Sequence, residues 1–149
     1  MDTLEDWFAE KISSDFSTLR KNAMALLQKE AELQEVVQLV GPDALPEKEQ
    51  GILLVTKMLR EDFLQQNAFH EVDASASLRK QYLMLKIIMR FHDRMENALS
   101  LGAQLKKVKE FPLIAKIGRM KEIPDDKEKD FEKMLAGIDS AFDSLVKAS

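Results

Sequence analysis

The sequence predicts an all-α fold, an antiparallel helical bundle of about five helices. The 149 residues include only five Gly and four Pro, and abundant Leu, Lys, Glu and Ala are typical of helices. Apolar residues recur at three- and four-residue steps, the spacing that places them on one face of a helix. No segment alternates apolar and polar residues as a strand does, and the chain has no internal repeat or low-complexity tract. Several helices joined by short connections pack as a bundle.

The first predicted helix, straight or bent, runs from the N-terminal residues to about Val40. Gly41-Pro42 ends it, because Gly suits the left-handed position after a helix and Pro cannot continue one. Pro46 fits the first turn of a second helix, where acidic residues complement the positive end of the helix dipole. The first stripe consists of Leu4, Phe8, Ile12, Phe16, Leu19, Ala23, Leu26, Leu33, Val37 and Val40, and the second of Ile52, Val55, Leu59, Phe63 and Gln66.

Asn67 to Ser77 is rich in small and polar residues and predicts a loop. Its last residue can cap a third helix that ends near Gly102. A fourth helix spans about Ala103 to Glu122, with an interruption at Pro112. The run Asp125 to Glu128 resembles a capping box that opens a fifth helix. The third stripe consists of Leu78, Tyr82, Leu85, Met89, His92 and Leu99, and the fifth of Phe131, Leu135, Ile138, Phe142 and Leu145.

Composition restricts the class of protein. A chain of this length forms one domain with a real core, and 45% apolar with 32% charged residues is ordinary for a soluble protein. The net charge of −4 disfavours a nucleic-acid binder. No segment approaches the ~18 unbroken apolar residues of a membrane span, and the acidic N-terminus lacks the features of a secretory signal. The absence of Cys excludes disulfides and thiolate metal sites and fits a reducing compartment.

No catalytic residue and no metal site are predicted within the chain. Nucleotide hydrolysis needs a glycine-rich loop of the type GxxxxGK[ST], and the nearest glycine pair, Gly41 and Gly51, precedes no Lys. The remaining candidate ligands and acid–base groups are interpreted as structural. His70, Glu71 and Asp73 are predicted to form a solvated loop, His92 a partly buried helix histidine, and Glu30, Glu32 and Glu35 helix-surface charges.

One segment is locally basic. Between Lys106 and Lys121 there are six cationic side chains and only one acidic side chain, that of Glu110. The simplest interpretation is a solvated helix face, and the alternatives are contact with an acidic neighbour or with an anionic surface. Phe111 is its only aromatic residue, so stacking on single-stranded nucleic acid is not expected. The six cations are Lys106, Lys107, Lys109, Lys116, Arg119 and Lys121.

The order of two sequence runs is the most specific feature. A helix, the turn LVGPDALPEKE (Leu39 to Glu49), a second helix and the run FLQQNAFHEVD (Phe63 to Asp73) follow one another. This order resembles the C-terminal helical domain of the catalytic A subunit of archaeal A-type and vacuolar V-type rotary ATPases, over about Asp2 to Lys121. The resemblance implies that residues 1–122 are this helical (lever) domain and that residues 123–149 are a C-terminal helix packing on the same bundle.

The resemblance gives the acidic turn a role. It occupies the place of the DELSEED sequence of the related F-type subunit, which implies contact with the central stalk. Two acidic residues of that motif are missing and Lys48 is added, so charge alone does not explain such a contact. The plain alternative is a helix–helix turn with a solvated acidic start to the second helix. The implied contact residues are Asp43, Ala44, Leu45, Pro46, Glu47, Lys48 and Glu49.

The same resemblance assigns Phe69 to the adenine side of a nucleotide pocket, with Ala68 shaping that pocket. An aromatic ring can lie against a purine without contacting the phosphates. The plain alternative is a loop aromatic folded back onto the bundle. Ser75 and Ala76 replace the Tyr-Cys pair usual in the family, which puts any contact of that Tyr in doubt.

The function implied for the parent protein is hydrolysis or synthesis of ATP with Mg²⁺, coupled to stalk rotation and H⁺ or Na⁺ translocation. Implied partners are B subunits of a catalytic ring and the central stalk, at the cytoplasmic side of the membrane and joined to it only through the complex. ATP or ADP and Mg²⁺ belong to the parent, and the chain alone is expected to bind no cofactor. We expect it to be a piece of a longer protein whose nucleotide domain lies upstream. The alternative is a freestanding helical adaptor that binds partner proteins and has no nucleotide role.

Overall fold

A computed structural model describes residues 3–64, 78–124 and 126–148 of the chain. These residues are almost entirely helical and contain no strand, so the predicted all-α bundle is confirmed. None of the described helices has an apolar stretch long enough to cross a membrane. The elements are α1 (Thr3–Val40), η1 (Pro42–Ala44), α2 (Glu47–Met58), η2 (Leu59–Leu64), α4 (Leu78–Ser100), α5 (Leu105–Lys109), α6 (Leu113–Arg119), η4 (Met120–Glu122) and α7 (Glu128–Ala148).

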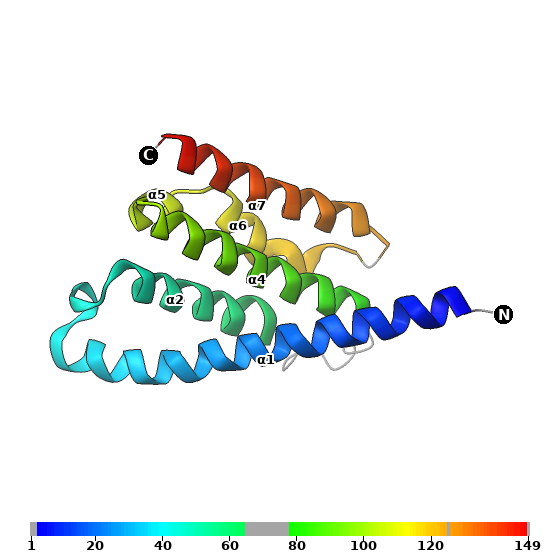
Figure 1. The fold of residues 1–149 in the computed structure, drawn as a ribbon, viewed down its shortest axis with the longest axis horizontal. Helices are drawn as coiled ribbons and strands as arrows, with labels where there is room; N and C mark the ends of the chain where they lie inside the picture. The colour runs from blue at the N-terminus through cyan, green and yellow to red at the C-terminus, as the bar shows by residue number, and fades with distance from the viewer. Residues whose placement is uncertain (1–2, 65–77, 125, 149) are drawn as a thin grey trace.

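The helices alternate in direction along the chain, with α1, α4 and α7 running one way and α2 and the α5–α6 segment the other (Figure 1). Helix α4 is central, because it packs against the α1–α2 hairpin on one side and against α7 on the other. The tip of the hairpin extends past the ends of α4 and α5, and the N-terminal end of α1 extends past the opposite end of the bundle.

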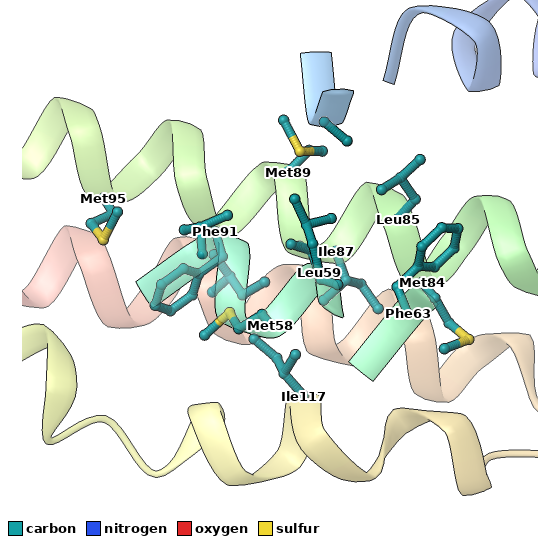
Figure 2. Packing of buried hydrophobic residues seen from close by; sticks show 14 of the residues in the cluster. Met58, Leu59, Phe63, Met84, Leu85, Ile87, Met89, Phe91, Met95 and Ile117 are labelled. Atoms are coloured by element: carbon teal, nitrogen blue, oxygen red, sulfur yellow. The ribbon is translucent and has the colours of Figure 1, made fainter. Parts of the chain in front are cut away.

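The central position of α4 explains why its apolar residues occupy more than one face. On the hairpin side, the Tyr82 ring meets Phe16 of α1 edge-on, with centroids 5.9 Å apart. On the α7 side, Phe142 packs edge-on against Phe91 of α4 at 5.3 Å and against Phe111 at 5.0 Å. Figure 2 shows α2, η2, α4 and α6 contributing side chains to one continuous core. Its buried α4 members are Tyr82, Met84, Leu85, Ile87, Ile88, Met89, Phe91, Met95 and Ala98.

Where side chains are described, the predicted stripes are correct in their centres and wrong at two ends; Leu4, Phe8 and Ile12 of the first stripe lie outside the described side chains. Val40 and Leu78 were predicted on core-facing stripes, but they are 63% and 68% exposed. Val40 is the last residue of α1, in the hairpin tip that no other described helix covers, and Leu78 is the first residue of α4. A helix stripe meets the core only where another element lies against it.

The fourth predicted helix is two short helices. The first, α5, ends at Lys109 and the second, α6, begins at Leu113, so the interruption predicted at Pro112 is confirmed. Proline has no backbone N–H to donate and its ring clashes with the preceding turn. The last turn, η4, tightens to a 3-10 helix before the connection to α7.

Helix α7 lies along α4 and is tied to it by ion pairs as well as by the aromatic contacts. Arg90 Nη1 is 2.9 Å from Asp139 Oδ2, and Arg94 donates to the Asp139 carbonyl at 3.2 Å and pairs with Asp143. Asp125, the first residue of the predicted capping box, lies outside the described residues, and the helix begins at Glu128.

Candidate functional site

The backbone of the turn between α1 and α2 depends on Gly41. Its φ of 89° with ψ of 161° lies in a region that residues other than Gly rarely adopt. Its amide donates to the Val37 carbonyl at 2.8 Å, which closes the last turn of α1. Pro46 stands at the N-cap of α2, where its carbonyl accepts from the amides of Glu49 and Gln50 at 3.0 Å each. The chain therefore reverses within five residues without leaving these groups unpaired.

The side chains of this turn point in different directions. Leu45 was predicted among the stalk-contact residues, but it is only 5% exposed, so its side chain is part of the fold and not of the surface. The side-chain amide of Gln50 donates from Nε2 to the Leu45 carbonyl at 2.7 Å, which holds the backbone of Leu45 in place. Glu47 is exposed, and its Oε1 lies 3.4 Å from the Leu105 amide at the start of α5. Of the other predicted contact residues, Asp43, Ala44, Pro46 and Lys48 are exposed and Glu49 is half-buried.

A polar cluster joins the two helices of the hairpin. Glu30 was predicted to be a helix-surface charge, but it is only 4% exposed. The Thr56 hydroxyl donates to Glu30 Oε2 at 2.9 Å, and Arg60 pairs with Oε1. Glu30 is buried because it occupies a core-facing position of α1, between Ala23 and Leu33. Such partners offset the cost of taking a polar group out of water.

The second helix continues from α2 into a π-helical turn, η2, a rare form that often marks functional sites. Leu59 and Phe63 of this turn are buried and, with α1 and α4, border a largely apolar cavity of about 300 Å³. Burial raises the pKa of Asp62 in the same turn; Lys121 opposes the rise and Glu61 adds to it. The cavity is lined by Arg20, Ala23, Met24, Leu27, Leu59, Phe63, Gln81 and Leu85.

Known proteins resemble this chain over nearly its whole length. The family described as the C-terminal domain of V and A type ATP synthase matches residues 5–109. The chain belongs to this family. The A subunit of the A-type ATP synthase of Methanopyrus kandleri is 47% identical over 148 residues, which are 99% of this chain and 25% of that protein. The A subunit of the Thermococcus kodakarensis A-type ATP synthase is 45% identical over 150 residues, again 99% of this chain and 25% of that protein.

This V and A type C-terminal domain spans about a quarter of the length of the curated relatives that it matches. The family match includes both helices of the hairpin, the turn between them and η2. Phe69 and Ala68, the predicted adenine-pocket residues, lie outside the described residues. So do Gln66, the predicted loop 67–77 with its cap Ser77, and the group His70, Glu71 and Asp73.

The other titratable groups of the described domain have structural surroundings. His92 is half-buried, with Nδ1 3.2 Å from Asp93 Oδ1 and Nε2 3.3 Å from Glu96 Oε2, as predicted for a partly buried helix histidine. Glu32 and Glu35 are exposed, as predicted. Over the described part of the chain, no three His, Asp or Glu side chains gather in a way that could hold a metal ion.

The basic segment of the domain follows α5, α6 and η4. Its lysines and arginine are exposed, apart from the half-buried Lys121, whose carbonyl accepts from Lys80 Nζ at 2.8 Å. This agrees with the solvated helix face that we expected first.

One polar feature that sequence reasoning missed had a detectable signal. The stripe predicted on α1 steps from Leu26 to Leu33, a gap of two helical turns, and Glu30 falls on the empty position. A charged residue at a stripe position, with Thr56 and Arg60 one turn apart on the next helix, indicates a buried interhelical pair. The inward orientation of Leu45 left no comparable signal, because turn residues have no regular period.

Proposed function

We propose that this domain belongs to the longer catalytic A subunit of an A-type ATP synthase and converts nucleotide occupancy there into movement of a central stalk. The observation that carries the proposal is the α1–α2 hairpin, whose tip extends past the rest of the bundle (Figure 1). Force on a protruding tip moves the helices behind it if they are packed as one body. Glu30, Thr56 and Arg60 supply such a connection between the two helices.

The stalk contact is proposed to involve the exposed part of the turn, Asp43, Ala44, Pro46, Glu47 and Lys48, with Glu49 at its edge. The inward Leu45 supports this surface from behind. A Leu side chain anchored in the core keeps the turn from flexing under load, because packed interiors deform little.

The proposed contact with nucleotide rests on the resemblance to the family. Phe69, with Ala68 beside it, is proposed to contact the adenine of ATP or ADP, and a nucleotide domain of the longer protein supplies the phosphate loop and Mg²⁺. B subunits of the catalytic ring and the central stalk are the proposed partners. The complex would work at the cytoplasmic side of a membrane that this domain reaches only through its partners.

The absence of Cys from the chain permits a direct test in the assembled complex. Asp43→Cys should form a crosslink to a cysteine placed on the central stalk, and the crosslink should stop ATP-driven rotation until it is reduced. The control is Asp126→Cys, exposed near the start of α7 at the other end of the bundle. Free rotation in the crosslinked Asp43→Cys complex would contradict the proposal and favour a helical adaptor. So would crosslinking to the stalk from Asp126→Cys but not from Asp43→Cys.

The 149-residue chain on its own should hydrolyse no ATP, because it contains no GxxxxGK[ST] sequence to hold the phosphates. A coupled phosphate-release assay on the purified chain measures this. ATP hydrolysis that copurifies with the chain through two independent columns would refute the proposal that a separate nucleotide domain performs it.

A further inference from the structure

The last turns of α1 carry an apolar strip that the described part of the chain leaves uncovered. Its members are Val36, Leu39 and Val40, which are 40%, 84% and 63% exposed. Their i, i+3, i+4 spacing puts them on one side of the helix. Six large apolar residues are exposed among those whose burial is described, and three of them lie within these five positions.

The opposite side of the same turns is also apolar. Leu33 is buried, and Val37 is half-buried where the hairpin closes. A helix with one packed face normally carries polar residues on the other, and a helix that is apolar on both sides has a partner on both. Contiguous exposed apolar surface of this kind marks interaction sites. The inner partner is the rest of the bundle, and the outer partner lies outside the described chain.

Charge near the strip defines the chemistry of that partner. The exposed carboxylate of Glu35 directly precedes the strip in the sequence, and that of Asp43 follows three residues after Val40. Glu32, one turn earlier, lies 3.5 Å from Lys29 Nζ. Apolar residues at i, i+3 and i+4 fit the seam of another helix, and acidic neighbours favour basic residues beside that seam.

We infer that Val36, Leu39 and Val40 are the main contact between this domain and an amphipathic, basic-flanked helix of the central stalk. This inference rests on the proposed function and changes which residues perform it. The polar residues of the turn then form the rim of the contact, where charges affect association rate and salt dependence more than affinity. Such a contact works with few of the acidic residues that the F-type motif carries.

Photocrosslinking in the assembled complex separates this inference from the proposed function. Benzoylphenylalanine is placed at Leu39, at Pro46 or at Leu101, an exposed leucine at the end of α4, and the crosslinked protein is identified. Crosslinks to the stalk from Leu39 in higher yield than from Pro46 support the inference. Crosslinks from Pro46 and none from Leu39 overturn it and leave the proposed function standing. A crosslink from Leu39 only to a protein other than the stalk overturns the inference, and stalk crosslinks from neither position overturn both.

Substitutions test the energetic claim. The double variant Leu39→Gln, Val40→Thr in the full-length protein should bind the isolated stalk about tenfold more weakly, since it removes apolar contact area. Leu101→Gln is the matched control and should bind as the parent does. Asp43→Asn with Glu47→Gln should reduce the salt dependence of binding with less than about a threefold change in Kd at ~0.15 M salt. An unchanged Kd in the apolar double variant, with its unfolding temperature retained, overturns the inference.

Discussion

At the scale of single residues, Glu30 shows how a polar group can be part of a core. Replacing it by Ala leaves Arg60 without its carboxylate partner and leaves the Thr56 hydroxyl only the Leu53 carbonyl, 3.1 Å away, as acceptor. We expect Glu30→Ala to lower the free energy of unfolding by about 1–3 kcal/mol, at the lower end if the half-exposed Arg60 turns into water. Glu32→Ala is the matched control on the exposed side of α1 and should stay within about 0.5 kcal/mol of the parent. Urea unfolding followed by circular dichroism measures both, and equal values for the two variants would mean that the cluster contributes nothing.

Asp62 provides a prediction about pH. Burial raises its pKa above the ordinary value of 3.8, with Lys121 and Lys57 opposing the rise and Glu61 adding to it. A carboxyl with a raised pKa in the folded state binds a proton that the unfolded state has released, so stability falls as pH rises from 3.8 through the raised pKa. Asp62→Asn removes that loss.

The unfolding free energy of Asp62→Asn, relative to that of the parent, should therefore be greater at pH 7 than at pH 3. Asp43→Asn, an exposed carboxyl at the hairpin tip, controls for the general effect of removing a negative charge. Chemical unfolding at the two pH values measures the difference. A relative stability of Asp62→Asn that is smaller at pH 7 than at pH 3 would contradict the burial argument.

At the scale of elements, the hairpin turn depends on one backbone conformation. Gly41→Ala should destabilise the chain by about 1–3 kcal/mol, because its φ of 89° is strained for any side chain. No atom lies within 4 Å of the added Cβ, so the loss would come from backbone conformation alone. Gly137→Ala is the matched control: the added methyl again meets nothing within 4 Å, but the position is inside α7. It should stabilise the chain by about 0.5–1 kcal/mol. Thermal unfolding of both variants tests the sign, and a Gly41→Ala variant at least as stable as the parent would show that the turn can relax.

The helices themselves could be predicted from the sequence because their causes are local. Gly41 admits a backbone conformation that other residues rarely adopt, and Pro112 cannot continue a helix, so the predicted end of α1 and the break between α5 and α6 follow from them. The π-helical form of η2 could not be predicted in this way. It adds a residue to one turn without a characteristic sequence, and the surrounding core decides whether the widened turn is accepted.

At the scale of the whole molecule, the packing of α7 makes a prediction about cooperativity. We propose that residues 1–122 form the lever domain and that residues 123–149 pack on it as one cooperative unit. Phe142 contacts Phe91 of α4 and Phe111 beyond α5. Phe142→Ala should cost about 3–5 kcal/mol and should destabilise the distant hairpin equally. Lys133→Ala, exposed on the same helix, is the control.

The measurement for Phe142→Ala follows two singly labelled samples. A dye on a cysteine replacing Glu32 reports on α1 within the hairpin, and in the other sample a dye on a cysteine replacing Glu132 reports on α7. Coincident urea transitions in the variant would support one cooperative unit. A transition for α7 that precedes the one for α1 by a resolvable interval would show that the C-terminal helix unfolds separately.

The overall arrangement and the candidate site differ in how far the sequence determines them. Helix spans and an antiparallel bundle follow from periodicity and short connections, and the family follows from two sequence runs. Which side chains face outward at a turn depends on the tertiary environment, as Leu45 and Val40 both show. The exposure of the apolar strip likewise depends on tertiary structure, because the end of α1 extends beyond the described helices that could have covered it.

The length of that extension has a mechanical consequence. Leu33, the last buried residue of α1, marks where the helix is clamped by the bundle, and about seven residues separate it from Val40, a span of about 10 Å at ~1.5 Å per residue. The deflection of a cantilever under an end load grows with the cube of its free length, so a span this short bends little. A sideways load at Val40 is therefore delivered to the clamp as a torque, and the work done at the tip reaches the bundle instead of being dissipated in bending of the helix.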